Sequence, residues 1–417
     1  MKKAIALLAI IAASMWTLAF FVGDFDEDWL EKQFQLDEVV VLQKDLPQQK
    51  QVVSLPQETT IEMPEDQVQG EVQVKSVNSI QSFEGSYAFS RLSVDEQRIY
   101  NEILVSLMNC SGPTELSTTN TSVIDKAFSC VMIDHPEIFY VDGYKYTEYS
   151  NGDVVKRVTF TGNYLYNKSE IESRQAKIDD VVNEILCNAP TGADDYLKVK
   201  YVFDTIVSNT EYDMESPDNQ NICSVFINGR SVCQGYAKAF QYLLQKMDIP
   251  ATLVIGKVKQ GEGHAWNLVE MNGQWYYVDS TWGDAYYLLG GTSQDEVVRT
   301  NSINYDYLGV TTEQICVTHL LDMPVDLPEC TEIRDNYYVR EGSYLYAYDE
   351  TKIRELFSRA YQNGNETVTI KCSDVDVYQE VWSQLIAQQK VFHFLQSQEG
   401  TIAYTNNDSQ RSITFWL

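Results

Sequence analysis

Residues 228–240 of the chain read NGRSVCQGYAKAF, which places Cys233 between a glycine-containing turn and the start of a predicted helix. The helix is predicted because apolar residues recur on one face through residues 237–244. A helix N-terminus carries partial positive charge and free backbone N–H groups, which favour a thiolate and can hold an oxyanion. This position indicates a cysteine nucleophile, and Gly235 permits close packing at the first helical turn.

A predicted β-hairpin further along the chain brings a histidine and an aspartate together. Asn272 and Gly273 form its two-residue turn, between strands rich in aromatic and β-branched residues. With the turn centred there, the pairing register puts Asp279 opposite Trp266. His264 and Trp266 share a face, so His264 and Asp279 are diagonal neighbours whose side chains can meet.

Cys233, His264 and Asp279 are therefore a candidate catalytic triad. Cys233 would attack an acyl carbon, His264 would take and return the proton, and Asp279 would hold the imidazole in the useful tautomer. A buried cysteine is usually a small hydrophobe, and this is our interpretation of the other cysteines. Cys233 differs because a histidine and an aspartate are predicted in register with each other downstream of it.

Three sequence blocks, CQGYA at 233–237, HAWN at 264–267 and WYYVDSTWGD at 275–284, together resemble the transglutaminase-like superfamily. The DHPE block at 134–137 is similar to one in exported bacterial members. The resemblance implies an α+β, papain-like core, in which the helix carrying the cysteine packs on an antiparallel sheet carrying the histidine and the aspartate. The superfamily includes protein crosslinkers, peptidases and deamidases, so it leaves the acyl acceptor open.

Weaker site candidates surround this triad. The resemblance implies that a second oxyanion donor comes from a side chain upstream of the cysteine, for which Tyr212 is the candidate, although a core tyrosine fits the same position. Gln234 and Trp266 are candidates for contact with the oxyanion or the substrate, and Trp266 also suits a packing role. Four further polar residues are expected to be structural, at the surface or in turns: His135, His319, His393 and Asp284.

The charge of the chain excludes one class of partner. Its 417 residues include 31 Lys and Arg against 60 Asp and Glu, which gives a net charge of −29. Such a charge repels nucleic acid and anionic lipid headgroups, so we expect no nucleic-acid partner. A solvated surface explains the charge more simply than recognition of a basic substrate.

The cysteine pattern argues against a metal site. The eight cysteines are widely spread and form no CxxC motif, so a zinc site is not expected. No DxDxDG calcium loop occurs either, and we predict no metal and no other cofactor. If Cys233 is a free nucleophile, seven cysteines remain and cannot all pair within one chain; Cys110 with Cys130 is the first pair to test.

The first residues have the layout of an export signal. Lys2 and Lys3 precede an apolar run over residues 4–22, and an acidic stretch follows it. A helix over this run would span roughly 28 Å, close to the thickness of a bilayer core. We therefore expect an uncleaved transmembrane anchor over residues 1–23, with its positive flank in the cytoplasm and the folded part extracytoplasmic. A cleaved signal peptide and secretion are the alternative.

Composition divides the rest of the chain into four regions. Residues 24–82 are polar, with scattered proline, and are predicted to be a flexible stalk. An N-terminal α+β region follows over 83–165, and the catalytic domain is predicted over 166–325. A smaller C-terminal α/β region, over 326–417, is expected to begin with a strand at 337–348.

These features predict an extracytoplasmic, membrane-anchored cysteine enzyme. It would form a thioester at Cys233 with a peptide or protein amide, including one associated with the cell wall, and release the acyl group to water or an amine. Protease, deamidase and crosslinker remain open, because acceptor choice depends on cleft shape. The alternative is a catalytically silent module that binds peptide or cell-wall ligands in the same cleft.

Overall fold

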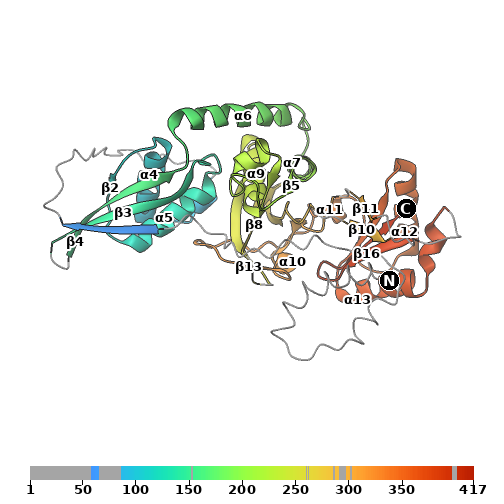
Figure 1. The fold of residues 1–417 in the computed structure, drawn as a ribbon. Coiled ribbons are helices and arrows are strands. Elements are labelled where there is room, and N and C mark those ends of the chain that lie inside the picture. Colours follow the sequence, from blue (N-terminus) through green and yellow to red (C-terminus); the bar gives the residue numbers. More distant parts are fainter. Residues whose placement is uncertain are drawn as a thin grey trace, which may run out of the picture. The chain divides into compact units, whose positions relative to one another are not determined.

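A computed structural model, drawn in Figure 1, describes the chain from residue 58 to residue 417 with several gaps. By contacts, the chain divides into two compact units, and Ser343–Leu417 belongs to a different unit from the segments that surround Cys233. No helix in the part of the chain that the structure describes is long and apolar enough to cross a membrane. The predicted anchor at 1–23 lies outside the described residues. Those residues are 58–64, 86–151, 154–259, 261, 263–284, 287–290, 297–300, 303–396 and 402–417.

A five-stranded antiparallel sheet forms the centre of the larger unit. Its strand order is β12-β9-β8-β7-β13. The predicted hairpin is confirmed: Met271 pairs with Gln274, and Asn272 and Gly273 both have positive φ, at 50° and 79°, as a tight hairpin turn requires. The strands are β7 (Ala251–Val258), β8 (Gly263–Met271), β9 (Gln274–Val278), β12 (Leu308–Val310) and β13 (His319–Leu321).

Helix α9 (Cys233–Lys246) packs on strands β7 and β8 of this sheet. Its first turn lies close to neighbouring backbone and hydroxyl groups because Gly235 has no side chain. A Cβ at that position would lie 2.0 Å from Ser231 Oγ and 2.7 Å from Ser224 Oγ. The surrounding elements are α6 (Lys168–Cys187), α7 (Asp195–Asn209), β5 (Glu211–Tyr212), α8 (Ile222–Phe226), β6 (Arg230–Ser231) and α10 (Thr312–Ile315).

The N-terminal α+β region has a sheet of its own, with strand order β1-β3-β4-β2. Ser93 is the N-cap of helix α4, where Ser93 and Glu96 form a capping box. Strand β1 pairs in parallel with β3 and falls within the predicted stalk, whose other residues lie outside the described ranges. The elements are β1 (Glu58–Pro64), α3 (Tyr87–Ser90), α4 (Val94–Met108), β2 (Thr114–Leu116), α5 (Thr121–Asp134), β3 (Val141–Asn151) and β4 (Val154–Tyr164).

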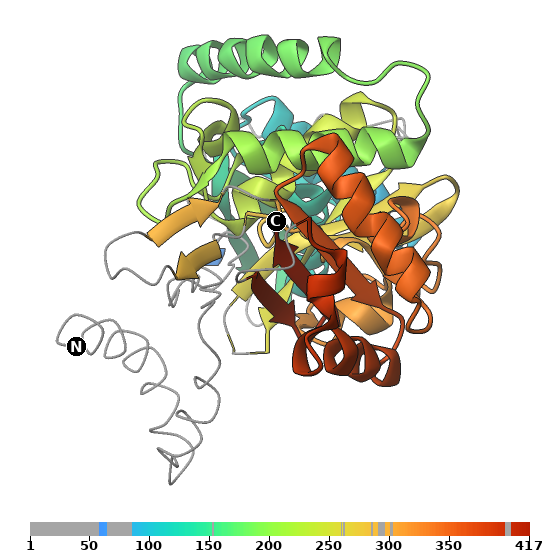
Figure 2. The same ribbon diagram turned by 90° about the vertical axis from the view of Figure 1, so that its right-hand side faces the viewer.

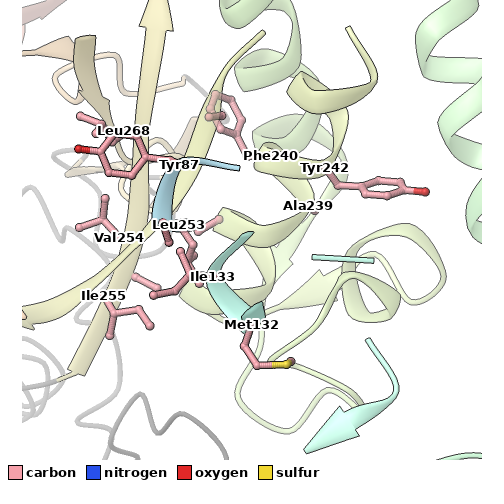
Figure 3. Packing of buried hydrophobic residues seen from close by; sticks show 14 of the residues in the cluster. Tyr87, Met132, Ile133, Ala239, Phe240, Tyr242, Leu253, Val254, Ile255 and Leu268 are labelled. Atoms are coloured by element: carbon pink, nitrogen blue, oxygen red, sulfur yellow. The ribbon is translucent and has the colours of Figure 1, made fainter. Parts of the chain in front are cut away.

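One apolar core joins this region to the sheet that carries the hairpin. Figure 3 shows Ile133 from α5 next to Leu253 from β7, within a cluster that also contains Phe240 from α9. Two polar contacts add to it: Gln241 Nε2 donates to the Ile133 carbonyl at 2.9 Å, and Gln245 Nε2 donates to the Asp134 carbonyl at 3.1 Å. The N-terminal region therefore supports the back of helix α9.

The C-terminal unit has a four-stranded sheet of order β14-β15-β17-β16. Figure 2 shows helix α12, in orange, beside these strands. The strand predicted at 337–348 is wrong: Asn336 Oδ1 accepts from the Tyr338 N–H and caps the short helix α11 (Tyr337–Arg340), and Gly342 turns the chain at a φ of 75°. The elements are β14 (Tyr344–Leu345), α12 (Glu350–Asn363), β15 (Thr367–Cys372), α13 (Val375–Trp382), β16 (Ala403–Asn407) and β17 (Ser412–Trp416), with β10 (Tyr287–Gly290) and β11 (Val297–Thr300) as a separate pair.

The pairing of Cys110 with Cys130 is also wrong. All eight cysteines have free thiols in the structure. Cys110 is exposed just beyond the end of α4, whereas Cys130 is fully buried on the inner face of α5. Two side chains that point to solvent and to core cannot meet without movement of the backbone.

Candidate active site

Cys233 is the first residue of helix α9, as predicted. The residue before it, Val232, is extended and provides no side-chain cap, so no side chain at that position competes for the first amides of the helix. Cys233 is itself 2% exposed. Its thiol is therefore placed where backbone N–H groups and the helix dipole favour negative charge.

The structure brings His264 and Asp279 together in the predicted register. His264 Nε2 lies 2.7 Å from Asp279 Oδ2, and both side chains are buried. The Cys233 side chain also interacts with His264 and contributes to the raised pKa of its imidazole. Because Nε2 is bonded to Asp279, Nδ1 is the ring nitrogen that a thiol could use.

A second histidine binds the same carboxylate. His319 Nε2 lies 3.1 Å from Asp279 Oδ2, and His319 is fully buried. The other oxygen, Oδ1, accepts the N–H groups of Thr281 and Trp282 at 3.0 and 3.1 Å. The expectation of a structural or surface residue missed this position of His319, because it depends on the placement of β13 beside β7, for which the sequence holds no local signal.

The electrostatics of the cluster separate the two histidines. Burial alone would lower the pKa of His264, but the Asp279 carboxylate, the hydrogen bond that it accepts from His264 and the Cys233 side chain raise it to about 10. Burial would raise the pKa of Asp279, but the charge of His264 and hydrogen bonds from both histidines hold it well below its usual range. Burial lowers the pKa of His319. The Asp279 carboxylate thus favours the charged form of His264, whereas burial favours the neutral form of His319.

Aromatic rings enclose this cluster. The Trp266 ring lies 5.8 Å from the His264 ring and 4.7 Å from the His319 ring, between ring centroids. The Trp282 ring lies 5.9 and 4.6 Å from the same two imidazoles. Trp266 is fully buried and packs against both histidines, as the packing interpretation expected. The low polarity of this wall strengthens the charge interactions inside it.

The remaining site candidates lie near the start of α9. Gln234 is buried, and its Oε1 has no hydrogen-bond partner among the described residues. Tyr212 pairs with Ser231 in the short β5–β6 ladder, so its backbone is adjacent to the strand that leads into Cys233. The Tyr236 hydroxyl donates to Asp284 Oδ2 at 2.8 Å, which gives Asp284 a structural contact. The substrate and oxyanion roles of Tyr212 and Gln234 stay predictions.

His264, Asp279 and His319 are also the one group in the described part of the chain whose ligand atoms are close enough to hold a metal ion, within 4.8 Å of one another. The donor set fits a hydrogen-bonded cluster better. Both Nε2 atoms approach the same carboxylate oxygen, which can only accept, so each nitrogen must carry a proton. A metal would have to displace both protons from a fully buried site.

A cysteine at a helix N-terminus, packed on an antiparallel sheet that carries histidine and aspartate, defines a papain-like architecture for a cysteine site. Residues 180–280 match the family model of the transglutaminase-like superfamily. The chain therefore carries a transglutaminase-like domain, which confirms the resemblance seen in its three sequence blocks.

Two curated relatives match part of the same region. The chain is 26% identical to the kyphoscoliosis peptidase of Mus musculus over 136 residues, which are 28% of this chain and 21% of that protein. It is 30% identical to the Homo sapiens protein of the same name over 122 residues, which are 25% of this chain and 18% of that protein. The chain thus spans about a fifth of the length of these relatives.

Solved structures also match. A crystal structure of a TGase aligns with a TM-score of 0.25 and 13% identity, covering 38% of this chain and 53% of that one. The periplasmic domain of TgpA from Pseudomonas aeruginosa, bound to ethylmercury, aligns with a TM-score of 0.21 and 18% identity, covering 31% of this chain and 57% of that one.

Proposed function

We propose that this protein is a cysteine acyl-transfer enzyme that acts on peptide or protein amides through a thioester at Cys233. The observation that carries the proposal is the buried hydrogen bond between His264 and Asp279, together with Cys233 at the start of α9, whose side chain interacts with His264. A buried imidazole held by a carboxylate beside a thiol is the arrangement that activates a cysteine nucleophile.

The chemistry follows from these positions. The Cys233 sulfur attacks the amide carbon, and the backbone N–H groups at the start of α9 stabilise the oxyanion. The C–N bond breaks as the His264 imidazolium gives its proton to the leaving nitrogen. Water or an amine then attacks the thioester carbon, His264 takes the proton of the attacking group, and the thiolate leaves. Asp279 stays ionised throughout and balances the charge on His264.

Two side chains near the nucleophile are proposed to assist. Tyr212, which pairs with Ser231 next to the start of α9, would supply a second oxyanion donor, and the unpartnered Oε1 of Gln234 would accept a substrate N–H. Neither assignment is required for the core reaction. Their loss should affect rate less than loss of Cys233.

The proposed setting is extracytoplasmic, with the membrane reached through an anchor at residues 1–23. The apolar run at 4–22 behind two lysines supports this part of the proposal. The substrates would then be peptides or proteins outside the cytoplasm, including those of the cell wall. No cofactor takes part in the proposed reaction, so full activity in excess chelator is expected.

Product chemistry tests the proposal. Wild-type protein is incubated with dimethylcasein and monodansylcadaverine, and ammonia, incorporated amine and new peptide termini are measured. Ammonia with incorporated amine indicates crosslinking chemistry, ammonia alone indicates deamidation, and new termini indicate proteolysis. The variant Cys233→Ala should lose all three, whereas Cys187→Ala, which removes an exposed thiol at the end of α6, should keep them.

The alternative, a silent binding module, predicts that His264 does not activate the Cys233 thiol. Alkylation of Cys233 by iodoacetamide, followed by peptide mass mapping, should be at least tenfold slower in His264→Ala than in wild type if the imidazole activates the thiol. Equal alkylation rates in both proteins, with no product from dimethylcasein, would contradict the enzyme.

A further inference from the structure

The unexpected member of the buried cluster is His319, the second imidazole on Asp279 Oδ2. We propose that His319 is a positioning residue for the acyl-transfer reaction, because its Nε2–H holds the Asp279 carboxylate in the orientation that binds His264. This inference rests on the proposed function. It adds a fourth residue to the candidate triad of Cys233, His264 and Asp279.

The fold delivers His319 to this place from the edge of the sheet. Strand β13 pairs with β7, and His319 is opposite Val258 there. Close approach depends on Gly256, where a Cβ would lie 2.0 Å from the Leu320 carbonyl oxygen and 2.7 Å from Trp266 Cη2. A glycine at the point where β13 and the Trp266 ring meet therefore lets the edge strand come close enough for its first side chain to enter the site.

The tautomer of His319 is defined by its two neighbours. Asp279 Oδ2 can only accept, so Nε2 carries a proton. Nδ1 lies 2.8 Å from Thr318 Oγ1, and Thr318 Oγ1 lies 3.3 Å from the Tyr307 hydroxyl. These distances are compatible with a chain in which Tyr307 donates to Thr318, Thr318 donates to Nδ1, and Nε2–H donates to Asp279. A neutral imidazole satisfies every one of these contacts.

Space filling does not explain a histidine here. The ring is fully buried, and its centroid lies 4.7 Å from the Trp266 ring, 4.6 Å from the Trp282 ring and 5.6 Å from the Tyr307 ring. A phenyl ring would fill such an aromatic enclosure without the desolvation of two ring nitrogens. What the imidazole adds is a donor to the carboxylate oxygen that also holds His264.

The expected effect of losing this donor is on the chemical step. With Nε2–H removed, Oδ1 keeps the Thr281 and Trp282 donors but Oδ2 keeps only His264, so the position of Oδ2 relative to the His264 ring is less constrained. A shift of the reacting groups by about 1 Å costs roughly 100-fold in rate. We expect kcat for dimethylcasein to fall roughly 10- to 100-fold, with KM changed less than about threefold, because His319 lies behind the reacting atoms.

Three substitutions of His319 test whether its side chain acts as a hydrogen-bond donor or only fills space. In His319→Gln the amide nitrogen can occupy the position of Nε2, whereas in His319→Asn it lies nearer to that of Nδ1, and His319→Phe keeps a ring but no donor. The proposal predicts kcat in the order wild type, Gln, then Asn and Phe, with Gln at least fivefold above Asn. His393→Phe, at an exposed histidine of the C-terminal unit, is the matched control and should leave kcat unchanged.

The outcomes distinguish failure of the inference about His319 from failure of the proposed function. If His319→Phe turns over like wild type, or Asn equals or exceeds Gln, the inference about His319 is overturned and the enzyme stands. If wild type gives no product from dimethylcasein, the proposed function fails first. The iodoacetamide rate at Cys233 then still tests His319: a rate that falls in Phe and recovers in Gln supports the positioning role, and equal rates overturn it. Comparison of Gln with Asn remains valid if His319→Phe does not fold.

Discussion

Two buried aspartates, Asp134 in the N-terminal region and Asp279 in the candidate site, show what neighbours do to a carboxylate. They are 3% and 0% exposed. Asp134 accepts from the N–H groups of Ala88 and Phe89 and from the Tyr100 hydroxyl. Burial nevertheless raises its pKa to about 6. At Asp279, burial acts in the same direction, but the charge of His264 and the hydrogen bonds of both histidines lower the pKa well below its usual range.

The opposite pKa shifts distinguish a carboxylate with a structural role, Asp134, from one in a candidate catalytic site, Asp279. Neutral donors hold Asp134 in place and join the end of α5 to helix α3, but they do not compensate for its burial. A cationic partner at 2.7 Å reverses the balance at Asp279. Burial and donor count alone therefore do not distinguish the two carboxylates; a directly hydrogen-bonded histidine does.

The largest expected effect is the loss of catalytic rate on substitution of Asp279. Asp279→Asn removes the charge that supports the His264 imidazolium, and kcat for dimethylcasein should fall on the order of 10³- to 10⁴-fold, as in other triads. Asp134→Asn is the matched control, for which kcat per folded molecule should change less than about threefold. Comparable losses of kcat in both variants, with both folded by circular dichroism, would remove the distinction.

The next effect is on stability. Asp134→Ala leaves the Ala88 and Phe89 N–H groups and the Tyr100 hydroxyl without their acceptor, so the free energy of unfolding should fall by about 3 to 5 kcal/mol. Urea denaturation followed by far-ultraviolet circular dichroism measures the change. A loss below about 1 kcal/mol would show that other acceptors replace the carboxylate.

The two aspartates should also respond oppositely to pH. The pKa of Asp134 is raised above its unfolded value to about 6, so the native state binds more protons between pH 4 and 6. The contribution of Asp134 to unfolding free energy then falls by up to about 3 kcal/mol as pH rises through this window. Asp279, with a lowered pKa, contributes stability that is lost only as pH falls below its unfolded value. Urea titrations of wild type and Asp134→Asn from pH 4 to 7 measure the difference, and a pH-independent difference would refute this assignment.

The smallest expected effect comes from a single donor. Tyr100→Phe removes one of the three hydrogen bonds to Asp134, at 3.0 Å, and keeps the ring in the core. The free energy of unfolding should fall by about 1 to 2 kcal/mol at pH 7, and by less at pH 4, where Asp134 is protonated. An equal loss of unfolding free energy at both pH values would mean that the strength of the Tyr100 hydrogen bond does not depend on the charge of Asp134.

Local chemistry made much of the fold and the triad predictable. The turn at Asn272 and Gly273 is determined by neighbouring residues, and it appears where predicted. The turn also determines the pairing register of β8 and β9, which is regular up to the end of β9. This register predicts that His264 and Asp279 are neighbours, and their side chains meet. The papain-like class was implied by the resemblance of the three sequence blocks around Cys233, His264 and Asp279.

What was missed depends on contacts between distant segments. His319 reaches Asp279 only because an edge strand docks beside β7 at Gly256. The strand predicted at 337–348 has a suitable alternation, but a cap at Asn336 and a left-handed Gly342 interrupt it. Cys110 follows the end of α4 and Cys130 lies within α5, and whether each side chain faces solvent or core depends on packing that a helix pattern does not reveal.

The apolar core shared by α5, α9 and β7 has a consequence for where the chain can be cut. A fragment that begins at residue 166, the predicted start of the catalytic domain, would lack α5. The core around Phe240 and Leu253 would then be exposed to water, and the Gln241 and Gln245 amides would lose their carbonyl acceptors. We expect the smallest autonomously folding fragment that contains Cys233 to start before Tyr87. The N-terminal α+β region would then act as an obligatory half of the folding unit.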